Sequence, residues 1–173
     1  MTSTLSTEKK TVSVLFVCLG NICRSPTAHG VFQGVVERAG LQSRIEIDSA
    51  GTSGWHIGNS ADGRSSEAAK RRGYDLSALR SRGMAEDDFE KFDYILAMDS
   101  SNLHDLEAIA PAAVLNSDPQ AAKLGLFLAY SQQSDYDEVP DPYYGGEDAF
   151  ELVLNLVEDA CQGLLREISC ELS

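Results

Sequence analysis

The sequence is poor in basic residues, and this scarcity limits the partners that it can have. Its 173 residues include 14 Lys and Arg against 27 Asp and Glu, which gives a formal net charge of −13 at pH 7. A surface with this balance repels nucleic acid backbones and anionic headgroups, which argues against nucleic acid or membrane as the main partner. The chain also lacks an apolar run long enough to span a bilayer, and it lacks internal repeats and linkers.

Metal-ligating residues are few and scattered. The three histidines, His29, His56 and His104, lie far apart in the chain, and no Cys or carboxylate stands at metal-finger spacing from them. We therefore expect no metal site and no cofactor. We expect His29 and His104 on solvated helix surfaces, and Cys161 and Cys170 as packing residues of the last helix.

The composition and the hydrophobic pattern fit one α/β domain. Hydrophobic residues make up 43% of the chain, which suits a single domain with a full core over residues 11–173, preceded by a polar leader at 1–10 that we expect to be disordered. Strand-like and helix-like segments alternate, which predicts an open parallel sheet of about four strands with helices on both faces. The expected strands are 11–17, 45–49, 94–98 and 113–115, and the expected helices are 26–39, 61–72, 85–89, 102–108 and 148–168.

The most informative segment is Cys18-Leu19-Gly20-Asn21-Ile22-Cys23-Arg24-Ser25, which sets a thiol and a guanidinium six positions apart at a strand-to-helix junction. Ligands of open parallel sheets bind beyond the carboxyl ends of the strands, where Cys18 falls. Gly20 and Asn21 tolerate left-handed dihedrals, so the loop can turn backbone N–H groups inward, and the following helix adds its positive end. The segment predicts a phosphate-binding loop after the first strand, in which Arg24 grips phosphate oxygens and the positive surroundings favour a Cys18 thiolate.

The longer segment 17–28 resembles the phosphate loop of the low-molecular-weight protein tyrosine phosphatase family, bacterial type. A second signature of that family, Asp141-Pro142-Tyr143-Tyr144-Gly145, lies far downstream, with the segments 48–52 and 93–99 between them in the family's order. The resemblance implies that 11–173 is a phosphatase domain for tyrosine-phosphorylated proteins, with a cognate tyrosine kinase as a further partner. It also implies a monomer or weak dimer, and its free thiols fit the reducing cytoplasm.

The resemblance assigns roles to the residues of the two motifs. Cys18 is the nucleophile that forms a phosphocysteine, Arg24 holds the phosphoryl group, and Asp141 acts as general acid and then as general base. Cys23 is the redox partner that forms a reversible disulfide with Cys18. The expected phosphate- and substrate-binding residues are Leu19, Gly20, Asn21, Ile22, Cys23 and Ser25 of the loop, and Trp55, Tyr143 and Tyr144, which can form an aromatic slot for a phenyl ring.

Four alternatives stay open on the sequence alone. Some bacterial relatives prefer phosphoarginine and carry Thr where this chain has Ile22, so Ile22 favours phosphotyrosine. A thioredoxin-coupled arsenate reductase of the same fold needs further cysteines in the middle of the chain, and residues 37–160 contain none. A non-catalytic phosphotyrosine-binding module would not need Asp141, and neither would a redox sensor built on Cys18 and Cys23. The partners of Arg82 and Asp99 also stay open, because Leu79 stands where animal enzymes have His.

Overall fold

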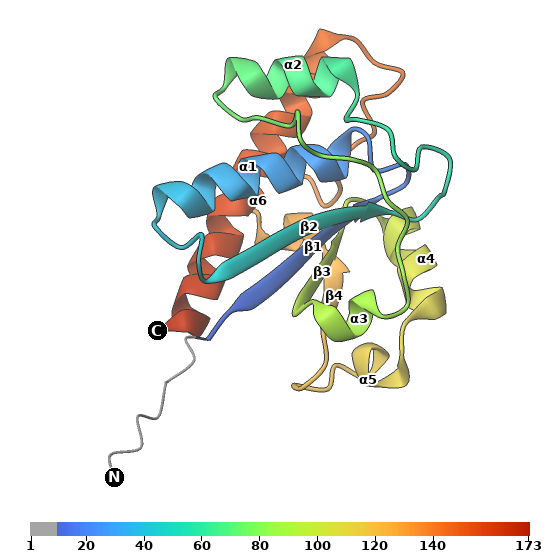
Figure 1. Cartoon of the computed structure of the whole chain (residues 1–173), viewed down its shortest axis with the longest axis vertical. Coiled ribbons are helices and arrows are strands. Elements are labelled where there is room, and N and C mark those ends of the chain that lie inside the picture. Colours follow the sequence, from blue (N-terminus) through green and yellow to red (C-terminus); the bar gives the residue numbers. More distant parts are fainter. Residues whose placement is uncertain (1–9) are drawn as a thin grey trace.

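The fold is a sheet of four parallel strands with helices on both faces (Figure 1). The computed structural model describes residues 10–173, so 1–9 of the expected leader lie outside it. The strands are β1 (Val12–Cys18), β2 (Ile45–Gly51), β3 (Tyr94–Ala97) and β4 (Lys123–Leu126), in the order β2-β1-β3-β4, and each neighbouring pair is parallel. The predicted open parallel sheet is therefore confirmed.

The helices follow the prediction except at one segment. They are α1 (Arg24–Arg38), α2 (Gly63–Arg71), α3 (Asp88–Lys91), α4 (Ser100–Ile109), α5 (Ala112–Leu115) and α6 (Glu147–Leu172), with a 3₁₀ turn η1 at Phe127–Tyr130. Within residues 10–173, none of these helices combines the length and apolar character needed to cross a membrane.

The expected strand at 113–115 is wrong, because these residues belong to α5. Pro111 is its N-cap and has an extended backbone (φ −63°, ψ 155°), a position at which the missing N–H of proline costs no helical hydrogen bond, and the alanines that follow favour a helical turn. The true fourth strand, β4, reads Lys-Leu-Gly-Leu and contains no β-branched residue, so its sequence carries little strand signal.

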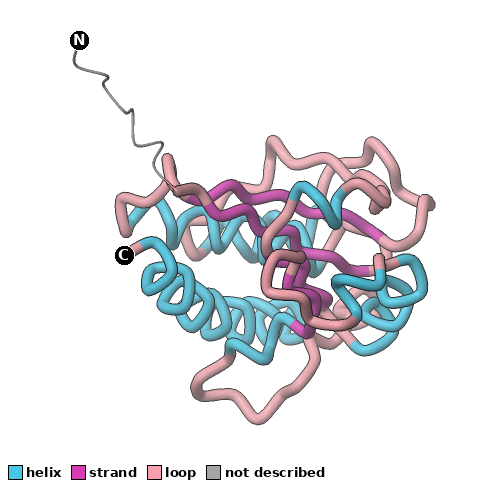
Figure 2. Tube along the Cα trace, turned by 90° about the horizontal axis from the view of Figure 1, so that it is seen from below, coloured by secondary structure: helices cyan, strands magenta, loops and turns pink. Residues whose placement is uncertain are grey.

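Strand β1 builds the core on both faces of the sheet, since all seven of its residues are buried. Val12, Val14 and Phe16 belong to one hydrophobic cluster, which includes buried residues of α1 and α6. Leu15 and Val17 belong to a second cluster, which includes residues of α3, α4 and α5. Figure 2 shows the strands running through the middle of the molecule with helices to either side.

The order of the strands places a crevice at the carboxyl end of β1. The chain leaves β1 through α1 to pair with β2 on one side, and later returns to pair β3 on the other side of β1. This reversal is the topological switch point at which open α/β sheets bind ligands. The loop from residue 131 to 146 returns to the same end, where the Val139 N–H donates to the Met98 carbonyl at 2.8 Å.

Helix α1 is buried along most of its length, which corrects the expectation for His29. Residues from Arg24 to Phe32 are all buried, and Gly30 lies so close to the Leu76 side chain that a Cβ at this position would come within 2.2 Å of it. His29 is 9% exposed, and its Nδ1 lies 3.0 Å from Ser49 Oγ. Burial lowers the pKa of His29, although the Asp48 carboxylate partly opposes this effect.

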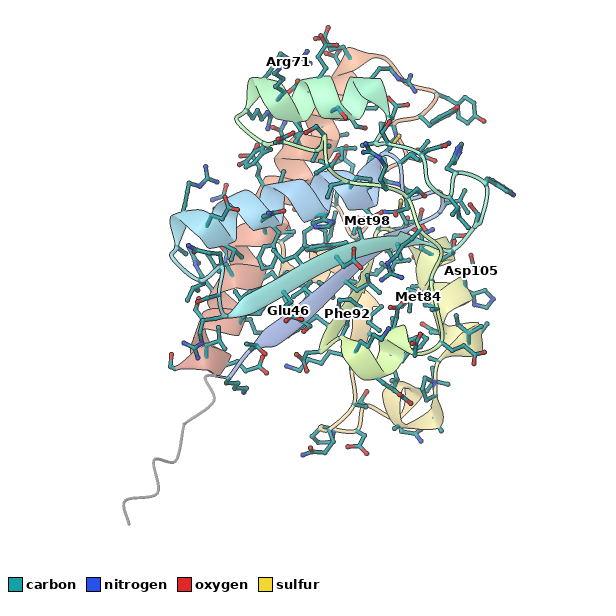
Figure 3. The ribbon with its side chains drawn as sticks, in the orientation of Figure 1. Glu46, Arg71, Met84, Phe92, Met98 and Asp105 are labelled. Atoms are coloured by element: carbon teal, nitrogen blue, oxygen red, sulfur yellow. The ribbon has the colours of Figure 1, made fainter. Side chains whose placement is uncertain are left out.

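The last helix packs as expected for Cys161, which is buried, but Cys170 is exposed and is not a packing residue. His104 lies on an exposed surface of α4, as predicted. At the other end of α6, Arg71 of α2, which is labelled in Figure 3, pairs with Glu147 at 3.3 Å and with Glu151 at 3.2 Å. These ion pairs join α2 to α6 beside the crevice.

Candidate active site

The loop between β1 and α1 surrounds the Cys18 sulfur with hydrogen-bonding groups. Cys18 is the last residue of β1 and is 3% exposed. Its Sγ accepts the Asn21 N–H at 3.3 Å and lies 3.0 Å from Ser25 Oγ. Of the two residues expected to tolerate left-handed dihedrals, Asn21 adopts them, with φ 55°. The sulfur is therefore surrounded by hydrogen-bonding groups of the loop.

Asn21 also braces the loop through its side chain. Its Nδ2 donates to Ser25 Oγ at 2.7 Å, and its Oδ1 accepts the Arg82 N–H at 3.0 Å. The Arg82 guanidinium in turn pairs with Asp48 and Asp88. The sequence left the partners of Arg82 open, and the structure shows that this residue supports the loop through its backbone.

Gly51 at the end of β2 allows the loop to approach the sheet closely. A Cβ at this position would lie 2.8 Å from the Leu19 carbonyl oxygen and 3.1 Å from the Gly20 carbonyl carbon, both of which are backbone atoms. The Thr52 N–H donates to the Cys18 carbonyl at 2.9 Å, so the segment after β2 runs directly beside the loop. Only glycine fits here without moving the loop.

Arg24 begins α1 and is held on one side by a carboxylate. Its side chain is 4% exposed, and its Nη1 donates to Asp99 Oδ2 at 2.6 Å and to the Val139 carbonyl at 3.1 Å. The second terminal nitrogen, Nη2, lies 3.8 Å from Asp141 Oδ2. The partner of Asp99, which the sequence left open, is therefore Arg24. This arrangement fixes the guanidinium while one of its edges faces Asp141.

The N-terminus of α1 adds further positive character. Within the described residues, the N-cap Cys23 makes no side-chain cap hydrogen bond, and the first turn contains no acidic residue. The first N–H groups of a helix have no acceptor within the helix, and the helix dipole places partial positive charge there. An anion is the complementary ligand for such an end.

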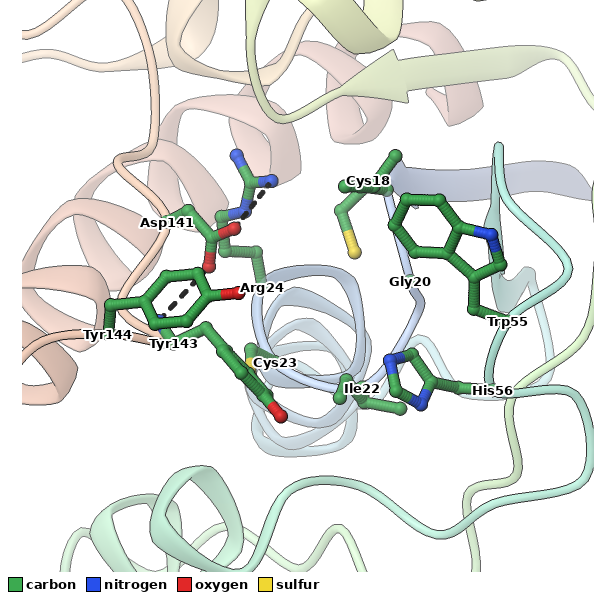
Figure 4. A pocket seen from close by; sticks show the side chains of 11 residues that line it. Cys18, Gly20, Ile22, Cys23, Arg24, Trp55, His56, Asp141, Tyr143 and Tyr144 are labelled. Carbon is green, nitrogen blue, oxygen red and sulfur yellow. Dashed lines mark hydrogen bonds and ion pairs between the residues drawn. The ribbon is translucent and has the colours of Figure 1, made fainter.

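These elements enclose a cavity of about 190 Å³ (Figure 4). Trp55 and His56 stand on one side of it, Asp141, Tyr143 and Tyr144 stand on the other, and the loop forms the floor. Trp55 is 76% exposed and Tyr144 is 95% exposed, so they rise as an open rim. The lining residues are Cys18, Leu19, Gly20, Ile22, Cys23, Arg24, Trp55, His56, Asp141, Tyr143 and Tyr144.

The structure thus brings ten of the twelve predicted site residues to one cavity. The other two, Asn21 and Ser25, are buried beneath it and contact the Cys18 sulfur. His56 lines the cavity too, and a Cβ on Gly20 would lie 2.9 Å from its Cδ2. Sequence reasoning missed His56, for which adjacency to Trp55 was the available signal.

Cys23 lines the cavity as a neutral thiol. It is 5% exposed, and burial raises its pKa to about 12, with the Asp62 carboxylate adding to the effect against a hydrogen bond from Ser65. Both Cys18 and Cys23 are free cysteines. Both thiols are buried, and they differ in their contacts: Cys18 Sγ accepts the Asn21 N–H and lies beside Ser25 Oγ, whereas Cys23 lies near Ser65 and the Asp62 carboxylate.

Among the described residues, no group of three or more His, Cys, Asp or Glu side chains is arranged to hold a metal ion. The chemistry available at the cavity is that of a thiol nucleophile, a guanidinium beside a helix N-terminus, and a carboxylic acid opposite them. Such a set suits transfer of a phosphoryl group to sulfur, with the acid protonating the leaving oxygen.

The comparisons with known proteins agree with this geometry. Residues 13–173 match the family model described as low molecular weight phosphotyrosine protein phosphatase. The chain is 45% identical to the low molecular weight phosphotyrosine protein phosphatase of Schizosaccharomyces pombe, over 92% of this chain and 99% of that protein.

Solved structures of phosphatases share the fold. A protein tyrosine phosphatase from Entamoeba histolytica, crystallised with Hepes in the active site, superposes with a TM-score of 0.86 at 39% identity, over 92% of this chain and 97% of the other. The Drosophila arginine phosphatase DARP superposes with a TM-score of 0.79 at 31% identity, over 90% and 96% of the two chains. The match of motif, fold and length shows that this chain belongs to the low molecular weight phosphotyrosine protein phosphatase family.

Proposed function

We propose that this chain hydrolyses phosphotyrosine in proteins through a phosphocysteine on Cys18. The observation that supports the proposal most strongly is the convergence of Cys18, Arg24 and Asp141 on one cavity of about 190 Å³. In the first step the Cys18 thiolate attacks phosphorus, a sulfur–phosphorus bond forms, and the bond from phosphorus to the tyrosine oxygen breaks. Arg24 and the N-terminus of α1 stabilise the charge on the equatorial oxygens.

Asp141 completes both steps as the proton carrier. It donates its proton to the departing phenolate oxygen, and it then takes a proton from the water that attacks the phosphocysteine. The second step releases inorganic phosphate and restores the thiolate, so no metal or cofactor is needed for the balance. Ser25, 3.0 Å from the sulfur, stabilises the thiolate as leaving group in this second step.

The walls of the cavity favour an aryl phosphate. Trp55 stands opposite Tyr143 and Tyr144 across the opening, and the two tyrosine rings are packed edge to face with their centroids 5.0 Å apart. A phenyl ring between these walls would be enclosed by aromatic side chains while its phosphate reaches Cys18. Ile22 makes the floor apolar beside the phosphate, where a phosphoarginine side chain would need a polar partner for its guanidinium.

Wider assignments rest on this activity. The partners are tyrosine-phosphorylated proteins, and a tyrosine kinase must produce them. A free nucleophilic thiol suits a reducing compartment, so we place the protein in the cytoplasm. From the family resemblance we expect a monomer or weak dimer. Cys23 would protect an oxidised Cys18 by forming a disulfide with it. Residues 11–173 form the phosphatase domain.

The proposal is tested by hydrolysis of phosphotyrosine peptides, with a chelator and a thiol reductant present. We expect turnover by the wild type, none by Cys18→Ser, and a loss of about a hundredfold or more in kcat for Asp141→Ala. Turnover that survives Cys18→Ser contradicts the proposed nucleophile. A parallel assay with phosphoarginine, on the wild type and Ile22→Thr, tests the substrate: preference of the wild type for phosphoarginine would overturn the choice of phosphotyrosine.

A further inference from the structure

Asp141 lies on a long loop that needs external support. Residues 131–146, between η1 and α6, contain no helix or strand. A hollow of about 630 Å³ lies against this loop, lined by Ser100, Leu126, Ala129, Tyr136, Asp137, Glu138 and Pro140. Side-chain packing alone therefore does not hold the loop on that side, and polar contacts hold it at two places. Asp159 of α6 accepts the N–H groups of Gln132, Gln133 and Ser134 at the start of the loop, and a second set of contacts holds the part that leads to Asp141.

One of these contacts joins the loop to the start of α4. Glu138 Oε1 accepts the Ser100 N–H at 2.7 Å. Ser100 is the first residue of α4, and the first turn of this helix has no acidic residue of its own. The cap residue Asp99 accepts the Asn102 N–H at 2.8 Å, which leaves the Ser100 N–H for another acceptor. A carboxylate at a helix N-terminus also interacts favourably with the helix dipole.

The neighbouring residue transmits this anchor to the catalytic groups. The Val139 N–H donates to the Met98 carbonyl at 2.8 Å, and the Val139 carbonyl accepts from Arg24 Nη1 at 3.1 Å. Val139 is completely buried. Two residues further on, Asp141 Oδ2 lies 3.8 Å from Arg24 Nη2. The chain from Glu138 to Asp141 is thus fixed at its start by α4 and by Met98, directly after β3, and it faces the guanidinium at its end.

We propose that Glu138 is a positioning residue for the general acid: by capping α4, it holds the loop so that Asp141 reaches the leaving oxygen of the substrate. This inference rests on the proposed role of Asp141. Glu138 lines the hollow rather than the cavity that contains Cys18, so it does not touch substrate. Its contribution must therefore appear only in reactions that need the proton from Asp141.

Leaving groups of different basicity separate proton donation from all other effects. Phenyl phosphate has a poor leaving group and depends on the acid, whereas dinitrophenyl phosphate has a good one and does not. The measured quantity is kcat/KM, which covers the steps up to formation of the phosphocysteine. For Glu138→Ala we expect a loss of about tenfold with phenyl phosphate and less than about twofold with dinitrophenyl phosphate, since general acid catalysis contributes about a hundredfold or more.

Matched variants separate the hydrogen bond between Glu138 and the Ser100 N–H from a general loss of negative charge near α4. Glu138→Gln keeps an oxygen that can accept the Ser100 N–H, so it should retain most of the wild-type kcat/KM with phenyl phosphate. Glu107→Ala removes an exposed carboxylate from the same helix α4 and should leave both substrates unaffected. Thermal unfolding of each variant shows that it is folded under the assay conditions.

A double variant tests whether Glu138 acts through Asp141. In an Asp141→Asn background the additional Glu138→Ala change should have no further effect on kcat/KM with phenyl phosphate. A full additional tenfold loss would overturn the inference. Equal losses of Glu138→Ala on both substrates, with weaker inhibition by inorganic phosphate, would overturn it too, because they would point to Arg24 instead. If Asp141→Asn itself shows no dependence on the leaving group, the proposed function fails rather than the role of Glu138.

Discussion

Replacement of Asp99 by Asn separates two contacts that meet at this carboxylate. Asp99 Oδ2 pairs with Arg24 Nη1 at 2.6 Å, and Asp99 Oδ1 caps α4 by accepting the Asn102 N–H at 2.8 Å. Asparagine is as good an N-cap as aspartate, so Asp99→Asn keeps the cap and removes only the negative charge. The Arg24 guanidinium, buried at 4% exposure, then loses its closer charged partner and keeps only the Asp141 carboxylate, at 3.8 Å.

The cost of this change follows from the burial of the pair. Removing one partner of a buried ion pair destabilises a protein by roughly 3–5 kcal/mol. The Asp99 side chain keeps 22% exposure, which screens part of the interaction, so the lower end applies and we expect a loss of about 3 kcal/mol. For a domain of this size the loss corresponds to a decrease in Tm of about 9 °C.

Phosphate should restore much of this stability, because it supplies the missing negative charge. Inorganic phosphate at a hundred times its Kd stabilises a folded protein by about 2.7 kcal/mol. At one fixed phosphate concentration the gain should be larger for Asp99→Asn than for the wild type, since a guanidinium that has lost its closer carboxylate binds an anion more tightly. The assay is thermal unfolding with and without phosphate, and Asp105→Asn, an exposed change on the same helix, is the control.

Two results would refute this reasoning. The first is an Asp99→Asn variant that unfolds within about 1 °C of the wild type, because the ion pair would then contribute too little to matter. The second is an equal phosphate-induced increase in Tm for both proteins. Either result would mean that Arg24 does not depend on Asp99 for its charge balance.

Three further predictions follow from other contacts. Gly51→Ala would place a Cβ 2.8 Å from the Leu19 carbonyl oxygen, so the loop must shift, and kcat/KM for an aryl phosphate should fall by about a hundredfold; unchanged kinetics would contradict the close approach. Because the pKa of Cys23 is about 12, iodoacetate at neutral pH should alkylate Cys18 and spare Cys23, as peptide mass spectrometry would show. Burial lowers the pKa of His29 in the folded state, so on acidification the unfolded state binds this proton first. The contribution of neutral His29 to the free energy of unfolding is therefore complete above about pH 6.5, and it is lost as the pH falls from there through the lower pKa of the folded state. Urea unfolding should show a smaller loss on acidification for His29→Asn than for the wild type.

The site was more predictable from the sequence than the edges of the fold. The segment 18–25 at a strand-to-helix junction predicts a phosphate loop with Cys18 and Arg24, whereas the role of Asp141 came from the family resemblance of the two motifs; the structure brings all three residues to one cavity. Local chemistry of this kind is readable because a phosphate loop needs its residues in a short continuous segment.

Long-range packing was not readable in the same way. His29 was expected on a solvated helix surface because bacterial relatives often have an acid at its position, but the sheet, α6 and the chain near Leu76 surround α1. The strand β4 was missed because a short segment with Gly and Lys becomes a strand only through pairing with β3. The support that Arg82 gives to Asn21 through its backbone also depends on tertiary contacts that leave no sequence signal.

The central claim is that phosphorus becomes bonded to the Cys18 sulfur during turnover. The most direct measurement is a rapid acid quench of the enzyme with a radiolabelled aryl phosphate, followed by peptide mapping. The account predicts label on the peptide that contains Cys18 and no label in the Cys18→Ser variant. With dinitrophenyl phosphate as substrate, Asp141→Asn should increase the amount of labelled enzyme, because it slows hydrolysis of the phosphocysteine more than its formation. Turnover with no labelled protein at any quench time, or label on another residue, would contradict it.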